Sequence, residues 1–309
     1  MLRLPLIFIS LLLIQSTVFA KKAETDLKII KVTTNVYAIV GSLGNRSKQN
    51  LGNNATFGVV VTREGVVLID PGATYEGAAK IHKLIKTVTT QPVKIVINSG
   101  GQDHRWLGND YFKKKGASII ANKEAVKDQK HRVQDQFFRL GTLMDEKSLK
   151  ATTPVYADKV FDAQYKFSLG GIKFEVVHAG QAHTPGDSFI WLPTQKVVFT
   201  GDIVYTQRML SVTGHSNSKS WLKAFDAFAV LKPKYVIPGH GMPTTLAVAT
   251  NDTYNYLFFL RTLLSEFIEA GGGIENVGKL DQSKYSYLYN YTGLKGRNAQ
   301  QVFQELEFE

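Results

Sequence analysis

The feature that most constrains this chain is an apolar, β-branched run that stops abruptly at a polar turn carrying glycine. Val93–Ile97 has the composition of a buried strand, and the turn that follows it places Asp103 next to His104. Ligand sites of α/β sheets collect just beyond the carboxyl ends of the strands. An Asp-His pair alone also fits a solvated turn, so this stretch indicates a site without establishing one.

Three later stretches have a similar build, because each is a turn marked by glycine or proline beside an apolar strand. They are Ala182–Asp187, which contains His183, then Thr200–Asp202, and then Pro238–Gly241, which contains His240. If the four turns meet at one sheet edge, five side chains gather there: Asp103, His104, His183, Asp202 and His240. Imidazole and carboxylate are ligands of zinc, and iron and manganese are the alternatives. The chain has no cysteine, so thiolate ligands and disulfides are excluded.

The remaining pattern alternates strands with amphipathic helices, which predicts an α/β layered fold. We expect a hairpin of Leu27–Val32 and Val36–Val40, strands at Phe57–Thr62 and Val66–Asp70, and a helix at Tyr75–Thr87. One or two helices are expected within Lys123–Leu149. A second run of strands starts at Lys159, and the last helices are expected at Thr253–Ala270 and Asn298–Leu306. The polar segment Gly41–Asn54 is expected to be a loop.

The amino terminus has the pattern of a secretory signal peptide. Met-Leu-Arg precedes an apolar run that is too short to span a bilayer, and Ala20 lies before Lys21-Lys22. We expect cleavage near residue 20, one domain at 21–309, no transmembrane segment after cleavage, and a periplasmic or secreted location. An uncleaved anchor is the alternative.

The formal net charge is +11, and loss of the expected signal peptide lowers it by one unit, because that segment contains Arg3 and no acidic residue. Such a surface favours anionic small-molecule substrates, envelope polymers or membrane head groups, and solubility alone is the alternative explanation. No nucleic-acid-binding module is recognisable, so no nucleic-acid partner is expected.

In this order, the four stretches resemble the metallo-β-lactamase superfamily, from about Leu27 to Leu260. The resemblance implies a four-layer αβ/βα sandwich, with the Gly41–Asn54 loop overhanging the active site. The first motif of that family usually reads His-x-His-x-Asp-His, and its first two histidines are missing here. If Asp103-His104 takes the place of the motif's Asp-His, the missing histidines fall on Ser99 and Gly101. If Asn98 and Gly108-Asn109 are registered instead, they fall on Gly100 and Gln102.

The resemblance also implies hydrolysis of an ester, thioester or amide by metal-activated water. The first registration keeps the family's second metal site as Asp103, His104, Asp202 and His240, so we expect a single zinc ion there. His183 is expected to be a further ligand or, with Asp103, a catalytic residue. Gln102 and Arg105 are candidates for substrate or supporting contacts. The alternatives are a β-lactamase and a non-catalytic envelope binding protein on a degenerate fold.

Overall fold

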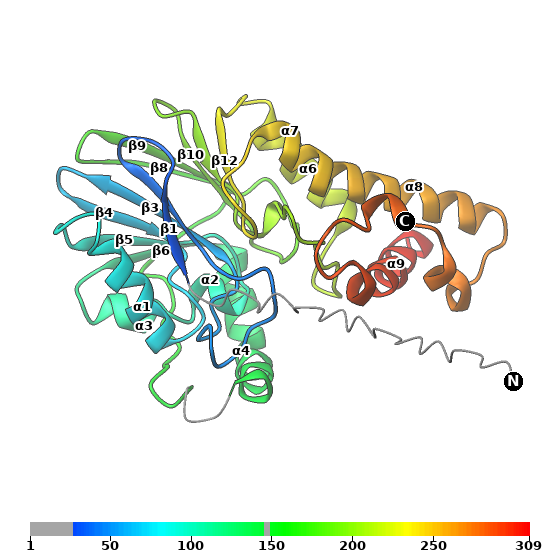
Figure 1. The fold of residues 1–309 in the computed structure, drawn as a ribbon, viewed down its shortest axis with the longest axis horizontal. Helices are drawn as coiled ribbons and strands as arrows, with labels where there is room; N and C mark the ends of the chain where they lie inside the picture. Colours follow the sequence, from blue (N-terminus) through cyan, green and yellow to red (C-terminus); the bar gives the residue numbers. More distant parts are fainter. Residues whose placement is uncertain (1–26, 145–148) are drawn as a thin grey trace, which may run out of the picture.

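The computed structural model describes residues 27–144 and 149–309, and Figure 1 shows two sheets with helices outside them. The expected signal peptide lies outside the described residues. Within residues 27–144 and 149–309, no helix combines the length and the apolar character needed to cross a membrane.

The first sheet has seven strands in sequential order, and its first four strands are antiparallel. From β4 onward the neighbouring strands are parallel. The strands are β1 (Lys28–Lys31), β2 (Val36–Val40), β3 (Thr56–Thr62), β4 (Gly65–Ile69), β5 (Val93–Asn98), β6 (Ser118–Asn122) and β7 (Lys159–Phe161). The expected hairpin is therefore confirmed as β1 and β2. The expectation that Lys159–Phe161 opens the second run of strands is wrong, because this segment pairs with Ile120–Asn122 of β6.

The second sheet has five strands in the order β12-β11-β10-β9-β8. They are β8 (Gln164–Leu169), β9 (Ile172–Val177), β10 (Phe189–Leu192), β11 (Val197–Phe199) and β12 (Tyr235–Ile237). β11 and β12 run parallel, so their carboxyl ends lie at the same edge. That edge carries Asp202 after β11 and His240 after β12.

The three largest apolar cores of the described residues hold the layers together and confirm the αβ/βα sandwich. The core between the sheets includes Val60, Phe174 and Phe199, and Gly58 leaves room for the Phe199 ring. A second core lies under α1 (Tyr75–Ile85) and α3 (Asn109–Lys113) on the outer face of the first sheet. The third core lies under α6 (Ser218–Ala229), α8 (Asn255–Glu269) and α9 (Tyr291–Glu307) on the second sheet. Burial of these apolar faces is the main driving force for the layered packing.

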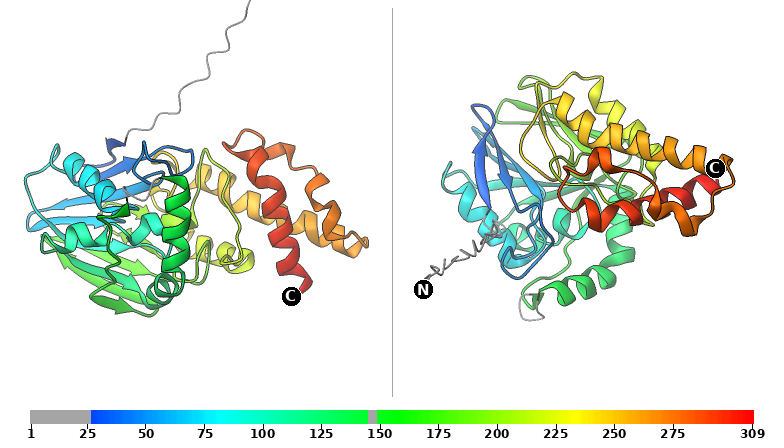
Figure 2. Two further views of the ribbon diagram at one scale, coloured as in Figure 1. Left: turned by 90° about the horizontal axis from the view of Figure 1, so that it is seen from below. Right: turned by 45° about the vertical axis from the view of Figure 1, so that its right-hand side comes forward.

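Other helices frame the sheet edge where the predicted turns lie. α2 (Asp103–Trp106) is a single turn directly after β5, and α4 (Lys123–Leu143) follows β6. After His240 the chain returns antiparallel to β12, so α7 (Leu246–Ala249) begins near the opposite end of that strand. Gly201–Ile203, Ile274–Lys279 and Ser283–Tyr285 form 3-10 turns, and Thr250–Tyr254 forms a π-helical turn before α8. Figure 2 shows α8 and α9 projecting from one end of the sandwich.

The final helix α9 begins at Tyr291, seven residues before the expected start at Asn298. The side chain of Asn298 on this helix is buried, and its Nδ2 donates to Leu210 O and Tyr256 Oη. The sequence from Tyr291 to Arg297 is polar and lacks an apolar helical period. Its helical conformation therefore depends on tertiary contacts as well as on local preference.

Candidate metal centre

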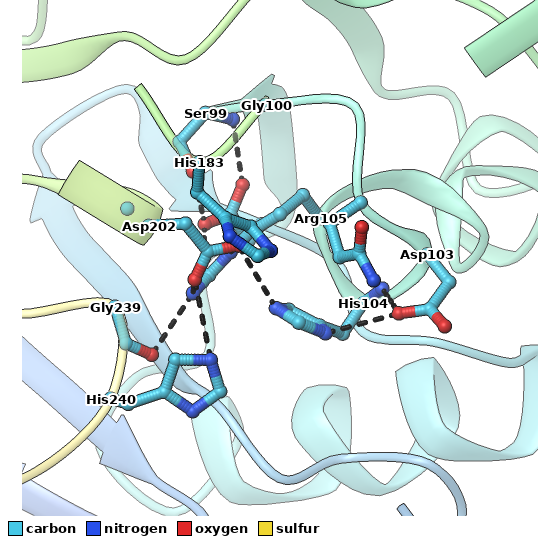
Figure 3. A network of polar contacts seen from close by, with 12 residues as sticks. Ser99, Gly100, Asp103, His104, Arg105, His183, Asp202, Gly239 and His240 are labelled. Carbon is cyan, nitrogen blue, oxygen red and sulfur yellow. Dashed lines mark hydrogen bonds and ion pairs between the residues drawn. The ribbon is translucent and has the colours of Figure 1, made fainter. Parts of the chain in front are cut away.

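The structure brings together three of the five predicted side chains: His104 on α2, Asp202 in the 3-10 turn after β11, and His240 after β12. Their ligand atoms all lie within 4.8 Å of one another, and all three residues are buried. His104 Nε2 is 3.3 Å from Asp202 Oδ2, and His240 Nε2 is 3.2 Å from Asp202 Oδ1. Figure 3 shows the two imidazoles directed at the Asp202 carboxylate.

The tautomer of His240 is determined by a backbone carbonyl. Its Nδ1 lies 2.9 Å from Asn54 O, which can only accept, so Nδ1 carries the proton. Burial holds the pKa of His240 well below its usual value, so the ring is neutral. Its Nε2 lone pair therefore faces Asp202 Oδ1, which is also an acceptor. Two acceptors at this distance lack a hydrogen between them, and a cation between them would satisfy both.

Arg105 lies behind Asp202 and is completely buried. Its guanidinium donates to both Asp202 oxygens, at 3.1 Å to Oδ2 and 2.7 Å to Oδ1, and to Asp70 Oδ2 at 2.9 Å. It also donates to Thr56 O and Gly239 O. Burial alone would raise the pKa of Asp202, but the Arg105 cation holds it well below its usual value.

Asp70, directly after β4, supports the site from behind Arg105. Its carboxylate accepts from Ser99 N and Ser99 Oγ at 2.7 Å each, and from Arg105. Burial raises the pKa of Asp70. Asp70 thus connects the turn after β5 to the guanidinium that supports Asp202.

The structure does not bring the Asp103 carboxylate into the group of His104, Asp202 and His240. Asp103 Oδ1 accepts instead from Arg46 Nε at 2.8 Å and Arg46 Nη2 at 2.5 Å, and it lies 3.1 Å from His104 Nδ1. Burial would raise the pKa of Asp103, but the Arg46 cation and His104 lower it overall. Arg46 comes from the Gly41–Asn54 loop. No recognisable motif marked Arg46, and a salt bridge across 57 residues leaves no local signal.

His183 lies beside the group of three. Its Nδ1 is 2.9 Å from Ser211 O, so this nitrogen carries the proton and Nε2 carries the lone pair. Burial lowers the pKa of His183 to about 4. The Tyr205 ring contacts both histidines, with centroid distances of 4.6 Å to His240 and 5.9 Å to His183. The roles of Asp103 and His183 as metal ligands stay predictions.

Side chains of α4 donate hydrogen bonds to the backbone of the turn after β5, where the first motif lacks its histidines. Gln129 donates to Gly100 O at 3.2 Å and Gln136 donates to Gly101 O at 2.8 Å. A methyl group added at Gly100 would overlap the Asp187 carboxylate. Asp187 is buried, and burial raises its pKa to about 8. Polar side chains therefore occupy the space that a larger residue at position 100 would need.

The geometry of α2 favours the second of the two registrations. Asn98 and Asn109 exchange side-chain hydrogen bonds at 2.9 Å, as residues that bracket the motif. His104 and Arg105 face Asp202, whereas Asp103 faces Arg46. When Asn98 and Gly108-Asn109 are aligned with the family's motif, the Asp and His of that motif fall on His104 and Arg105. The sequence alone marked Arg105 only as a candidate for substrate or supporting contacts.

Comparison with known proteins identifies one family. Residues 52–240 match the sequence model of the metallo-beta-lactamase superfamily. A metallo-beta-lactamase type 2 from Elizabethkingia meningoseptica is 24% identical over 219 residues, covering 70% of this chain and 79% of the relative. A metallo-beta-lactamase type 2 from Bacteroides fragilis is 22% identical over 229 residues, covering 71% of this chain and 81% of the relative.

Solved structures share the fold. A metallo-beta-lactamase from Pontibacter korlensis has a TM-score of 0.57 and 24% identity, covering 73% of this chain and 96% of that one. An inverting sec-alkylsulfatase from a Pseudomonas species has a TM-score of 0.71 and 16% identity, covering 90% of this chain. The match spans 50% of the alkylsulfatase chain.

Proposed function

This chain belongs to the metallo-beta-lactamase superfamily, and on that premise we propose that it is a hydrolase dependent on a single metal ion. The ion is held by His104, Asp202 and His240. The observation that carries this proposal is the buried group of three ligand atoms within 4.8 Å of one another. The two facing acceptors, His240 Nε2 and Asp202 Oδ1, support it further.

The donor set fits a catalytic metal. Three protein ligands of imidazole and carboxylate type, with a position left for water or substrate, are typical of catalytic zinc sites. Iron and manganese accept the same ligands and are the alternatives. When bound, such an ion supplies a Lewis acid that polarises the scissile bond and activates water near neutral pH.

Arg105 is the reason for proposing one ion rather than two. Its guanidinium donates to both oxygens of Asp202 and contributes a fixed positive charge on that side of the carboxylate. A second cation there would have to displace a completely buried arginine that also neutralises Asp70. The turn at Gly100–Gln102 offers no imidazole for a second site.

His183 is proposed to act directly on the reaction. It is buried, neutral near pH 7, and holds its lone pair on Nε2 because Nδ1 donates to Ser211 O. Nε2 either completes the ligand set or accepts the proton of the attacking water. The variant His183→Ala separates these roles, because only the first lowers the metal content.

The proposed substrate is a small molecule carrying an anionic group. Arg208 is nearly buried, and among the described residues its guanidinium donates only to Gly44 O, at 2.9 Å, while its Nε lacks a partner. A cavity of about 320 Å³ is lined by Gly44, whose carbonyl accepts from Arg208, by Gln207, the chain neighbour of Arg208, and by Gly241, the chain neighbour of His240. An arginine that has no carboxylate partner and that contacts a residue lining a cavity is a candidate to bind an oxyanion there.

Esters, thioesters and amides are the proposed bonds for hydrolysis. The similarity to an alkylsulfatase adds sulfate esters, and the related metallo-beta-lactamases add β-lactams as a side activity. We also propose export to the periplasm or secretion after cleavage near residue 20, which sequencing of the mature amino terminus tests.

Metal analysis and a substrate panel test the proposal together. Purified protein is expected to contain about one metal ion per chain, and chelator is expected to abolish hydrolysis of chromogenic acetate, phosphate or sulfate esters or of a chromogenic β-lactam. The variant His240→Ala is expected to lose the ion and the activity. The matched control is His82→Ala, since His82 lies on α1 and contacts Tyr111.

Three results would contradict the proposal. Hydrolysis that is unaffected by chelator would exclude a metal mechanism, and absence of any bound zinc, iron or manganese would support the alternative of a non-catalytic binding protein. Two ions bound with similar affinity would contradict the single-ion site.

A further inference from the structure

Asp103 and Arg46 both contact the same nitrogen of His104. Arg46 Nη2 lies 2.6 Å from His104 Nδ1, and Asp103 Oδ1 lies 3.1 Å from it. Arg46 also donates to Asp103 Oδ1 through Nε and Nη2. The three groups are buried or nearly so, with side-chain exposures of 12% for Arg46, 5% for Asp103 and 2% for His104.

His104 Nδ1 cannot accept a hydrogen bond from Arg46 and donate one to Asp103 at the same time. Guanidinium has only donors, so Nδ1 must accept when Arg46 contacts it, and the neutral ring then carries its proton on Nε2. That proton points at Asp202 Oδ2, 3.3 Å away. With the proton on Nε2, His104 has no lone pair to offer a metal in the group of His104, Asp202 and His240.

Binding of a metal at Nε2 requires the other tautomer. The proton on Nε2 leaves to solvent and solvent supplies one to Nδ1, so no net proton is released by this exchange. The Nδ1 proton then needs an acceptor, and Asp103 Oδ1 lies within reach. A carboxylate that accepts from the second nitrogen of a ligating histidine orients the ring and raises its basicity.

We propose that Asp103 is a positioning residue for the metal ligand His104, and that Arg46 competes with Asp103 for Nδ1, so that metal binding and the Arg46 contact exclude each other. This inference rests on the proposed function. It assigns Asp103 a role outside the ligand set, in place of the direct ligand role expected from the first registration.

Release of Arg46 needs only its side chain to rotate. It lies between β2 and β3, and separate contacts hold this loop: Asn54 Nδ2 and Arg208 Nη1 both donate to Gly44 O. Among the described residues, the side-chain hydrogen bonds of Arg46 are those with Asp103 and His104. The backbone anchors can therefore stay while the guanidinium leaves the ring.

Zinc affinity, measured by competition with a chromogenic chelator, tests the competition. Arg46→Gln is expected to bind zinc about 10-fold more tightly than the natural chain, because no contact has to be broken first. Asp103→Ala is expected to bind zinc about 10- to 100-fold more weakly, and Asp103→Asn, which keeps an acceptor oxygen, is expected to recover part of that loss. The matched control is Arg63→Gln, an exposed arginine at the opposite end of β3.

The tautomer of His104 gives a readout that a purely structural role would not change. Nitrogen NMR of histidine-labelled natural chain is expected to show the proton on Nε2 without zinc and on Nδ1 with zinc. A proton on Nδ1 in the zinc-free chain, or zinc affinity in Arg46→Gln equal to that of the control, would overturn the inference while leaving a metal site in place. If neither the natural chain nor any variant binds zinc, the proposed function fails as well.

Discussion

Replacement of Arg105 by methionine tests the central support of the site. Met is nearly as long as Arg and apolar, so it fills most of the space but removes the charge and all five hydrogen bonds that the guanidinium donates. Arg105 is 0% exposed, and its carboxylate partners Asp70 and Asp202 are each 1% exposed. Solvent therefore does little to compensate the loss.

The expected loss of unfolding free energy follows from these burials. Breaking a buried ion pair by removing one partner costs about 3–5 kcal/mol, because a charge is left uncompensated. Burial already raises the pKa of Asp70, so Asp70 can take up a proton once Arg105 is removed. Only Asp202 is then left as an uncompensated charge, and the cost of a broken ion pair applies once. We expect Arg105→Met to lose about 3–5 kcal/mol, a large part of the ~5–15 kcal/mol typical of a folded protein.

Urea unfolding of metal-free protein, followed by far-UV circular dichroism, measures this loss. Uncompensated buried carboxylates have folded-state pKa values above their unfolded values, so they favour the folded state at low pH and the benefit is lost as pH rises. The difference from the natural chain is therefore expected to be larger near about pH 7.5 than near about pH 5.5. Asp202→Asn added to Arg105→Met is expected to recover part of the stability.

The control and the refuting result are direct. Arg63→Met replaces an exposed arginine and is expected to change the unfolding free energy by less than about 0.5 kcal/mol. If Arg105→Met loses less than about 1 kcal/mol, Arg105 does not neutralise Asp202 as described, and the argument for a single metal ion loses its basis.

Three further predictions follow from the same geometry. Gly100→Ala is expected to lower the unfolding free energy by about 1–3 kcal/mol, because its methyl group meets the Asp187 carboxylate. Gly296→Ala on α9 is the control: the added methyl group meets nothing, so this variant is expected to raise the unfolding free energy by up to about 1 kcal/mol. Urea unfolding compares the two variants. Burial raises the pKa of Asp187 to about 8, far above its ordinary value of 3.8, so the protonated form favours folding, and stability is expected to fall by up to about 1.4 kcal/mol per pH unit as pH rises between these values. Thermal melts across this range check the slope, which Asp187→Asn should flatten, and an unchanged slope in the variant would contradict the assignment. Zinc at about 100 times its dissociation constant is expected to add about 2.7 kcal/mol to the unfolding free energy, an increment that chelator removes and that His240→Ala lacks.

Much of the fold could be predicted from the sequence, because it depends on local patterns. Apolar, β-branched runs predicted the β1–β2 hairpin and the strands β3 to β5, and the apolar stripe of Tyr75–Thr87 predicted α1. The pairing of β7 with β6 could not be predicted, since a three-residue strand fits either sheet and only long-range hydrogen bonds decide between them.

The sequence by itself determined that turns bearing Asp103-His104, His183, Asp202 and His240 follow apolar strands, and it predicted that they share one sheet edge. Only the tertiary structure decided which side chain faces which. Successive residues of a helical turn point about 100° apart, so a shift of one position on α2 directs His104 and Arg105 at Asp202 and turns Asp103 to Arg46. Spacing along a chain conveys the order of such groups, whereas their direction depends on contacts between segments that are distant in the sequence, and here those contacts come from a loop arginine 57 residues before Asp103.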